Sequence, residues 1–259
     1  MDLASTTFPG SSDRNLIIIH GYSGSQDDFT HVCDPLTDVA TVTTIDLPGH
    51  GASPRLEMYD YGRLAEAVET FIDAAEMRQP DIVGHSMGGR VLLELAMRNP
   101  HIPRSIVLMN TWGDRPDRGA FSKPIRRVFA LPRHEIAAAL AAIDRDTGER
   151  SAVVSVWGAE AIQAHWEYNA DHFDENARID LGRLVFLDDD DVLSAAQSLK
   201  IPATVIVGSR DTPLVGPAHR LAASLPNATL AIIDGAFHSP QLTHPERWRS
   251  AMREHLAVS

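Results

Sequence analysis

Short runs of apolar, mostly β-branched residues recur along the chain and alternate with stretches of helical periodicity. Continuous apolar runs are typical of strands buried on both faces of a parallel sheet, whereas apolar spacings of three and four residues indicate helices. The alternation predicts an α/β fold: a doubly wound, mostly parallel β-sheet with helices on both faces. Strands are expected near residues 3–8, 16–19, 41–45, 81–84, 105–109, 203–207 and 229–233. Helices are expected near residues 26–37, 60–77, 192–199, 217–225 and 245–256, with one more directly after the strand at 81–84.

The alternation is interrupted in the middle of the chain. No β-branched strand run occurs there, and alanine-rich helical stretches are expected at 135–143 and 151–170 instead. Because the interruption follows a strand, we expect an insertion at the carboxyl end of the sheet, over the crevice where such folds bind ligands. The prediction is a core domain of residues 1–112 and 191–259 that carries a helical cap or lid of residues 113–190.

Composition narrows the classes of protein that need consideration. The chain has 259 residues, 44% hydrophobic and 22% charged, with a net charge of −12. This charge opposes binding to nucleic acid or to an anionic membrane, so neither partner is expected. Cys33 is the lone cysteine, which excludes an intramolecular disulfide and a cysteine-cluster metal site. No secretory signal and no membrane-length apolar run is found, so a cytoplasmic protein is expected; the sequence carries no signature of oligomeric state.

The strand at 81–84 ends in Gly84-His85-Ser86-Met87-Gly88, and a helical pattern begins at once. A Gly-x-Ser-x-Gly sequence at a strand-to-helix turn holds the serine in a strained conformation with its hydroxyl exposed above the sheet. Glycines are needed two residues on either side because a Cβ there would collide across so tight a turn. The five-residue pattern alone is a weak indicator, and its strand–turn–helix setting is what supports Ser86 as a nucleophile.

A serine hydroxyl is a poor nucleophile near neutral pH and needs a base that is itself oriented by a carboxylate. Both partners must lie at the carboxyl ends of strands, where Ser86 is presented. His238, on a small-residue turn after the last strand, is the preferred base, with His244 as the alternative. Asp211, in the turn after the penultimate strand, is the preferred acid, with Asp234 as the alternative.

Several motifs occur in a fixed order along the chain. They are His20-Gly21, the Asp-x-Pro-Gly-His-Gly-x-Ser segment from Asp46 to Ser53, the elbow at Ser86, Gly-x-x-Asp from Gly208 to Asp211, and Gly-x-x-His from Gly235 to His238. With them the chain resembles the α/β-hydrolase family, in particular its capped esterases, lactonases and haloperoxidase-like members. The order serine, acid, histidine is also that of the family. The N-terminus is too short for the usual pair of leading strands, so we expect the sheet to lack one.

The resemblance implies an oxyanion hole made by the backbone N–H groups of Tyr22 and Met87. Both groups lie beyond strand ends beside Ser86, and Met87 begins a helix whose N-terminal dipole favours negative charge. The Ser23 hydroxyl is an additional candidate donor, whereas His20 is expected to shape the loop. The implied activity is that of a serine hydrolase that cleaves a small-molecule carboxylic ester or lactone through an acyl-enzyme.

No cofactor and no metal is expected. The chain contains no Gly-x-Gly-x-x-Gly and no phosphate loop, so no nucleotide is implied. The run Asp188 to Asp191 lacks the spaced glycine and distal glutamate of a calcium loop, and we interpret it as a solvated charge run or helix start. For the substrate pocket, Trp112 is the preferred aromatic residue. Trp157, Trp166 and Tyr168 either line the pocket or pack the inserted helices.

Two rival hypotheses remain. The same triad also serves carbon–carbon bond hydrolysis and the elimination step of the menaquinone-pathway synthase, whose elbow the stretch from Gly84 to Arg90 resembles. Such enzymes need a basic residue for a substrate carboxylate, and Arg126, Arg127 and Arg133 are candidates, although surface charge is the more ordinary role. The rival of another class is a non-catalytic ligand-binding protein that retains the hydrolase fold.

Overall fold

The computed structural model describes residues 2–114, 122–142 and 148–259. In this part of the chain seven strands form one sheet in the order β1-β3-β2-β4-β5-β6-β7, antiparallel at β1 and parallel elsewhere. The predicted fold class is therefore confirmed. A single described strand, β1, precedes the central strand β2, as expected. The strands are β1 Ser5–Phe8, β2 Asn15–Ile19, β3 Thr41–Ile45, β4 Asp81–His85, β5 Ser105–Met109, β6 Ala203–Gly208 and β7 Ala228–Ile233.

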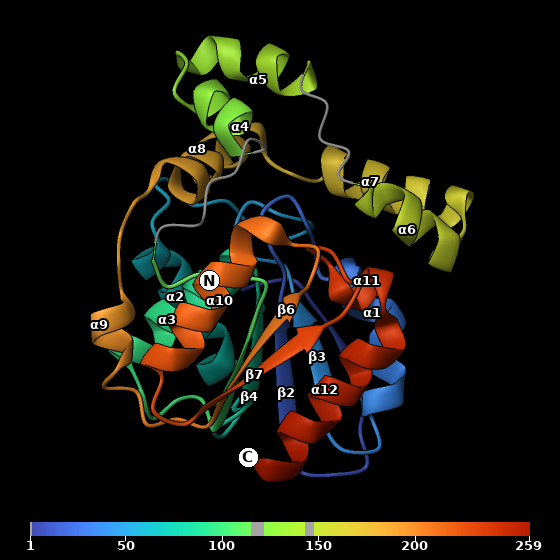
Figure 1. The fold of residues 1–259 in the computed structure, drawn as a ribbon, viewed down its shortest axis with the longest axis vertical. Coiled ribbons are helices and arrows are strands. Elements are labelled where there is room, and N and C mark those ends of the chain that lie inside the picture. Colours follow the sequence, from blue (N-terminus) through green and yellow to red (C-terminus); the bar gives the residue numbers. More distant parts are fainter. Residues whose placement is uncertain (1, 115–121, 143–147) are drawn as a thin grey trace.

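Helices cover both faces of the sheet (Figure 1). Alternate residues of one strand enter different core clusters, as Ile17 and Ile18 of β2 do, because successive side chains of a strand point to opposite faces. One face packs against α2 Tyr61–Ala74, α3 Met87–Arg98, α9 Leu193–Ala196 and α10 Thr212–Ser224. The other face packs against α1 Asp27–Cys33, the short helix η1 Asp34–Leu36 and α12 Pro245–Val258, with α11 Pro240–Thr243 just before α12.

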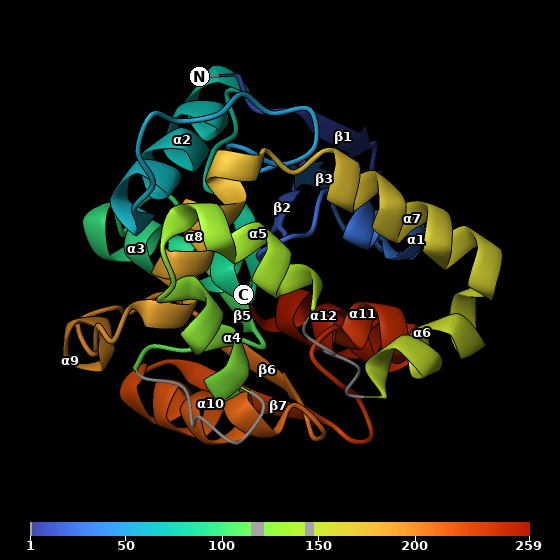
Figure 2. The ribbon, with the colours of Figure 1, turned by 90° about the horizontal axis from the view of Figure 1, so that it is seen from above.

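Between β5 and α9 the chain forms five described helices, which we call the helical insert. They are α4 Ser122–Phe129, α5 Arg133–Ala141, α6 Glu149–Trp157, α7 Ala159–Asp171 and α8 Glu175–Leu187. The insert lies beyond the carboxyl ends of the parallel strands (Figure 1). Seen from above, α4, α5 and α8 form one group and α6 and α7 lie apart from them, along α1 and α11 (Figure 2).

Each group of the insert has its own apolar cluster. The α4–α5–α8 group packs around Phe129, Ile136 and Ile179, with Tyr22 of the core against it. In the α6–α7 group, Val153 and Ile162 pack against Leu242 of α11. Because the two clusters share no residue, the groups are held to the core separately.

A buried polar network also ties α7 to α1. His165 Nε2 and Asn169 Nδ2 lie 2.8 and 3.0 Å from Asp28 Oδ1, and Ser25 Oγ donates to Asn169 Oδ1 at 2.6 Å. Burial raises the pKa of Asp28, but the hydrogen bond and the charge of His165 outweigh it and hold that pKa below its usual value. The pair therefore favours the ionised carboxylate, which anchors α7 beside the loop that follows β2.

Several helices differ from the prediction: α4 and α8 are additional, and α9 is shorter than the expected helix at 192–199. The stretch 151–170 is two helices, because Gly158 between α6 and α7 has a φ of 84°, a positive value that a continuing helix does not allow. Helix α10 begins at Thr212 rather than near 217, since Pro213 occupies a first-turn position where it is tolerated, and Pro217 lies inside the helix. The predicted helix 135–143 is α5, and its last expected residue, Ile143, lies outside the described residues.

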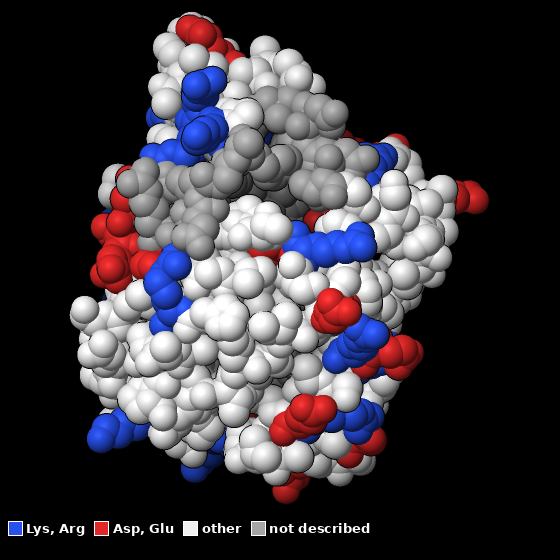
Figure 3. Space-filling view, in the orientation of Figure 1, with Lys and Arg blue, Asp and Glu red and all other residues white. Residues whose placement is uncertain are grey.

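The surface in the orientation of Figure 1 carries both signs of charge. Figure 3 shows acidic and basic side chains interspersed over the described part of this face. In the described ranges, no helix has the length and apolar character required to cross a bilayer.

Candidate active site

The turn after β4 is built around Ser86. Its backbone has φ 53° and ψ −116°, a strained conformation for a residue with a side chain. A Cβ on Gly84 would lie 2.4 Å from the carbonyl oxygen of Gly88, and a Cβ on Gly88 would lie 2.4 Å from the carbonyl oxygen of His20. Both positions therefore require glycine. The Ser86 N–H donates to the Met109 carbonyl at 2.8 Å, which ties the strained residue to the end of β5.

The structure brings the three predicted catalytic residues together. His238 Nε2 lies 3.0 Å from Ser86 Oγ, and His238 Nδ1 lies 2.7 Å from Asp211 Oδ2. A carboxylate can only accept, so Nδ1–H donates to Asp211 and Nε2 is left to accept from the serine hydroxyl. Ser86 follows β4, Asp211 follows β6 and His238 follows β7, so the three meet at the carboxyl edge of the sheet. The alternatives His244 and Asp234 take no part in this chain of hydrogen bonds.

Asn110 supports the carboxylate from the end of β5. Its Nδ2 donates to Asp211 Oδ2 at 2.7 Å and to the Phe237 carbonyl at 3.3 Å. Asn110 has a φ of 45°, which asparagine tolerates better than most residues. Burial raises the pKa of Asp211, but the charge and hydrogen bond of His238, together with the Asn110 bond, outweigh burial and lower it. Sequence reasoning missed Asn110; its position directly after a central strand was the available signal.

His238 is held as a strong base. Burial lowers its pKa, but the charge of Asp211, the hydrogen bond to Asp211 and the charge of Glu149 outweigh burial and raise the pKa to about 9. The imidazolium formed when the serine proton is accepted is therefore stabilised. The neutral form, which alone can accept that proton, becomes predominant in alkaline solution.

His85 holds the backbone of the same histidine. Its Nε2 lies 2.8 Å from the His238 carbonyl oxygen. A carbonyl oxygen can only accept, so Nε2–H is the donor. Burial and the neighbouring charge of His238 lower the pKa of His85 to about 3, which keeps its ring neutral. Sequence reasoning also missed this contact, because it joins residues at the ends of different strands.

The loop after β2 lies directly beside the nucleophile. A Cβ on Gly21 would come within 3.0 Å of Ser86 Cβ, so the backbone leading to Tyr22 runs against the serine. Met87 is the first residue of α3, and its N–H therefore has no acceptor within that helix. This placement supports the predicted oxyanion hole, which stays a prediction. The Tyr22 side chain points to the insert, where its hydroxyl donates to the Arg178 carbonyl at 2.9 Å.

His20 shapes this loop through both ring nitrogens. Its Nδ1 lies 2.7 Å from the Gly21 carbonyl oxygen, and its Nε2 accepts from the Leu47 N–H at 2.9 Å. Nδ1 is thus the protonated nitrogen, and the ring joins the loops after β2 and β3. Ser23, with a φ of 60°, is one of the residues that line the adjacent cavity.

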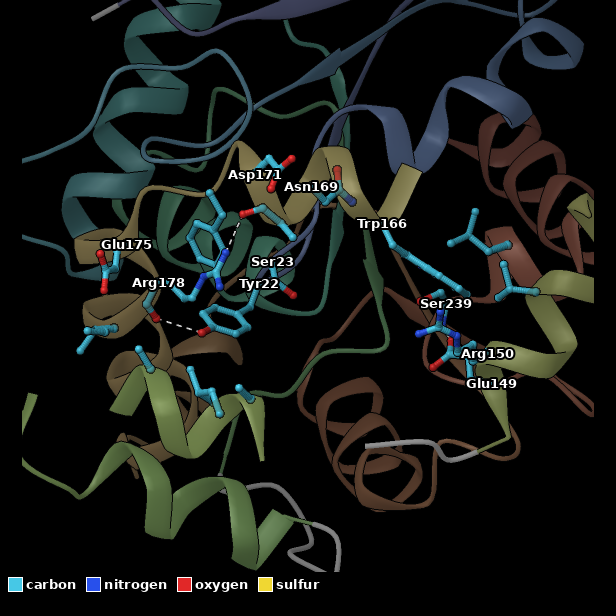
Figure 4. Close-up of a pocket in the computed structure, with 18 residues that line it drawn as sticks. Tyr22, Ser23, Glu149, Arg150, Trp166, Asn169, Asp171, Glu175, Arg178 and Ser239 are labelled. Carbon is cyan, nitrogen blue, oxygen red and sulfur yellow. Dashed lines mark hydrogen bonds between the residues drawn. The ribbon is translucent and has the colours of Figure 1, made fainter. Parts of the chain in front are cut away.

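A cavity of about 1030 Å³ lies between the two groups of the insert and the loops of the core. Figure 4 shows Tyr22 and Ser23 near its centre, Arg178 and Glu175 on the α8 side, and Trp166, Arg150 and Glu149 on the α6–α7 side. Apolar side chains from the insert complete its walls. The cavity therefore adjoins the predicted oxyanion loop and the residue after His238, Ser239.

Of the predicted pocket aromatics, the structure brings only Trp166 into the described lining of this cavity. Trp112 is buried in the main core cluster. Trp157 donates to the Leu242 carbonyl at 2.8 Å and packs on His31. Tyr168 stacks on His172. Trp157 therefore packs helices, the other role considered for it, and Trp112 and Tyr168 are not among the described residues that line the cavity.

The remaining charged candidates lie on the surface. Arg126 pairs with Asp189 at 3.3 Å, Arg133 pairs with Asp180 at 2.5 Å, and Arg127 is exposed. The aspartate run, Asp188 to Asp191, lies just before α9, and Asp191 Oδ1 accepts from the Leu193 N–H at 2.9 Å. Within the ranges 2–114, 122–142 and 148–259, no cluster of three or more His, Cys, Asp or Glu residues could hold a metal ion.

Comparison with known proteins decides the family. Residues 14–245 match the alpha/beta hydrolase fold family. The chain belongs to this family. It is 29% identical over 249 residues to the pimeloyl-(acyl-carrier protein) methyl ester esterase of Chromobacterium violaceum, and the match covers 93% of this chain and 94% of that relative.

Solved structures also share the fold of this chain. An esterase from Thermogutta terrifontis superposes with a TM-score of 0.80 at 21% identity, covering 99% of this chain and 93% of the other. The enol-lactonase from Burkholderia xenovorans superposes with a TM-score of 0.75 at 19% identity, covering 98% and 96%. The resemblance found in the sequence is confirmed, and the relatives of this chain include esterases and other hydrolases.

Proposed function

We propose that the protein is a serine hydrolase that cleaves a small-molecule carboxylic ester or lactone through an acyl-enzyme. The observation that carries the proposal is the unbroken chain of hydrogen bonds from Ser86 Oγ through His238, at 3.0 Å, to Asp211, at 2.7 Å. It combines a strained nucleophile, a base and an orienting acid in one site. A protein that only binds a ligand has no physical need for that strain, which weighs against the non-catalytic rival.

In the first half of the reaction Ser86 Oγ attacks the substrate carbonyl carbon while its proton passes to His238 Nε2. The N–H groups of Tyr22 and Met87 bind the oxyanion of the tetrahedral intermediate. One such donor contributes about 3–4 kcal/mol of transition-state stabilisation. Asp211 keeps His238 in the required tautomer and stabilises the imidazolium.

In the second half His238 gives its proton to the leaving alkoxide, and the acyl group remains esterified to Ser86. A water molecule then loses a proton to His238 and attacks the acyl carbonyl. The collapse of this second intermediate breaks the ester bond to Ser86, returns the proton to its Oγ and releases the acid. With a lactone, the alcohol and the acid leave on the same molecule.

We also propose that the helical insert acts as a cap, with residues 113–190 as the cap and residues 1–112 and 191–259 as the core. The cavity between the two groups of the insert supports this division. Its volume of about 1030 Å³ is at the upper end of the usual range for small-molecule sites, roughly 300–1,000 Å³. Leu140, Val153 and Trp166 give it apolar walls, which suit a substrate of moderate size with an apolar acyl part.

The relative from Chromobacterium violaceum supports the ester class, since its name describes a methyl ester esterase. The rival chemistry that needs a basic residue for a substrate carboxylate gains little from the candidates named for it. Arg126 and Arg133 are ion-paired, and Arg127 is exposed and absent from the cavity lining.

A fluorophosphonate probe tests the nucleophile. We expect the wild type to be labelled and to hydrolyse a short-chain p-nitrophenyl ester. Ser86→Ala should lose both properties, because no other serine of the described chain faces an oriented base. The matched control is Ser105→Ala, which also lies next to a histidine and should be labelled like the wild type.

Two outcomes would change the proposal. Wild-type protein that resists the probe would overturn the serine-hydrolase function. Labelling without turnover across a panel of ester and lactone chain lengths would favour the carbon–carbon or lyase alternative.

A further inference from the structure

Helix α6 of the insert is fastened at both ends to the segment that follows the proposed catalytic base. At its first residue, Glu149 Oε1 accepts from the Ser239 N–H at 2.6 Å. At its last residue, Trp157 Nε1 donates to the Leu242 carbonyl at 2.8 Å. Between them Val153 packs on Leu242. Helix α6 is thus bonded to the segment that follows His238 rather than lying loosely above it.

The carboxylate of Glu149 bonds to the core rather than to the N-terminus of its own helix. At the first turn of a helix, an acidic residue ordinarily interacts with the helix's own N-terminus. Here Oε1 instead accepts from a backbone N–H of the core, at the residue directly after His238. Glu149 also lines the cavity, so its charge faces the space between the insert and the site.

The titratable and charged groups that face His238 come from three places. Asp211 approaches from the end of β6 and His85 from the end of β4, both within the core. Glu149 approaches from α6, and its charge raises the pKa of His238. Its negative charge adds to that of Asp211 in favouring the protonated imidazole.

We propose that Glu149 is a positioning residue that reaches from the insert to fix the backbone beside His238 and to stabilise its protonated form. The inference rests on the proposed hydrolase function, because it assigns a role in that reaction. On this proposal, His238 is a fully effective base only while α6 keeps its contact with the segment that follows His238. When α6 is displaced, His238 loses a backbone anchor and a favourable charge together.

Two substitutions separate the charge from the anchor. Glu149→Gln keeps an oxygen that accepts from Ser239 N–H but removes the charge, whereas Glu149→Ala removes both. Glu160→Gln, at an exposed position in the first turn of α7, is the matched control. The measurements are the rate of fluorophosphonate labelling and kcat/KM for a p-nitrophenyl ester between pH 6 and 10, with circular dichroism to check that each variant is folded.

For Glu149→Gln we expect the acid limb of both profiles to move to lower pH by about half a unit, with little change in the alkaline plateau. Glu149→Ala should show the same shift and a plateau lowered by about tenfold, since the His238 loop is no longer anchored. Glu160→Gln should match the wild type. Glu149→Gln profiles that coincide with the wild type would overturn the inference, even if Glu149→Ala fails to fold. A wild type that the probe does not label would instead contradict the proposed function.

Discussion

A serine, a histidine and an aspartate meet at each edge of the parallel sheet, yet only one of the two edges resembles a hydrolytic site. At the carboxyl ends, Ser86 meets His238 and Asp211. At the amino ends, Ser105 begins β5 with its Oγ 2.7 Å from His255 Nε2 and 2.5 Å from Asp81 Oδ1. The residue types are the same, so the difference in chemistry lies in how they are connected.

At the carboxyl ends the histidine is in the middle, whereas at the amino ends the serine is in the middle. Ser105 donates its proton to Asp81, so His255 Nε2–H must donate to Ser105 Oγ. His255 Nδ1, then unprotonated, accepts from Thr204 Oγ1 at 2.8 Å. The base therefore has no lone pair directed at the serine hydroxyl, and Arg14 pairs with the aspartate.

The backbone conformations of the two serines and the pKa values of the two histidines also distinguish the two ends of the sheet. Ser105 is an ordinary strand residue with no exposed surface, whereas Ser86 has a positive φ. Burial lowers the pKa of His255 to about 4, despite the opposing charge of Asp81, while the pKa of His238 is raised to about 9. A buried serine, histidine and aspartate in contact thus form either a nucleophile or a structural network, depending on which residue stands between the other two.

The largest contrast is expected from replacing the two aspartates. Asp211→Asn should leave the fold intact and lower kcat by about 10⁴-fold, because His238 loses the acceptor that sets its tautomer. Asp81→Asn should leave turnover of folded protein near normal but lower the free energy of unfolding by about 3 kcal/mol, since Arg14 loses its buried partner. Ester hydrolysis and urea denaturation measure the two effects. Near-normal turnover in Asp211→Asn would reassign the acid, with Asp234 the next candidate.

The pH dependence of stability separates the two histidines. The pKa of His255 in the folded protein, about 4, lies below the ordinary value of 6.5. The contribution of His255 to the free energy of unfolding is therefore present above pH 6.5 and is lost as pH falls towards 4. The loss amounts to about 3 kcal/mol when complete. In His255→Gln the free energy of unfolding should change less over this window. His238 acts oppositely, since its raised pKa contributes stability that is lost as pH rises from 6.5 to about 9.

Urea denaturation at pH 7, 5.5 and 4.5 measures how the free energy of unfolding depends on pH. The wild type should lose stability more steeply than His255→Gln, with His134→Gln, at an exposed position of α5, as a control that follows the wild type. Equal slopes for wild type and His255→Gln would show that His255 is protonated in the folded network, which would contradict the hydrogen-bond order inferred at the amino ends.

The sequence predicted the strands and the proposed catalytic residues because both have local signatures. Buried strands appear as apolar runs, and Ser86, Asp211 and His238 each follow such a run within a short motif.

Asn110, His85 and Glu149 could not be predicted, since their partners lie 101, 153 and 90 positions away along the chain. The Ser105 network was not predicted for the same reason. The burial of Trp112 in the core depends on packing that no local pattern shows, and the alanine-rich stretch 151–170 has no clear periodicity that would have marked the break at Gly158.

The smallest expected effect tests the direction of hydrogen bonding at the amino ends. Thr204→Val removes the hydroxyl that donates to His255 Nδ1 and leaves a buried acceptor unpaired. This change should lower the free energy of unfolding by about 1 kcal/mol, or somewhat more if the acceptor stays dry. The matched control is Thr229→Val. Thr229 Oγ1 lies 3.2 Å from Thr204 Oγ1 but its residue is exposed, so water can replace the lost bond.

Turnover should be unchanged in both threonine variants, because neither residue lies at the carboxyl edge of the sheet. If Thr204→Val is as stable as Thr229→Val, His255 does not depend on the Thr204 donor. The contrast between the two ends of the sheet would then rest on Asp81 and Ser105 alone, whose short hydrogen bond still places the serine, rather than the histidine, in the middle.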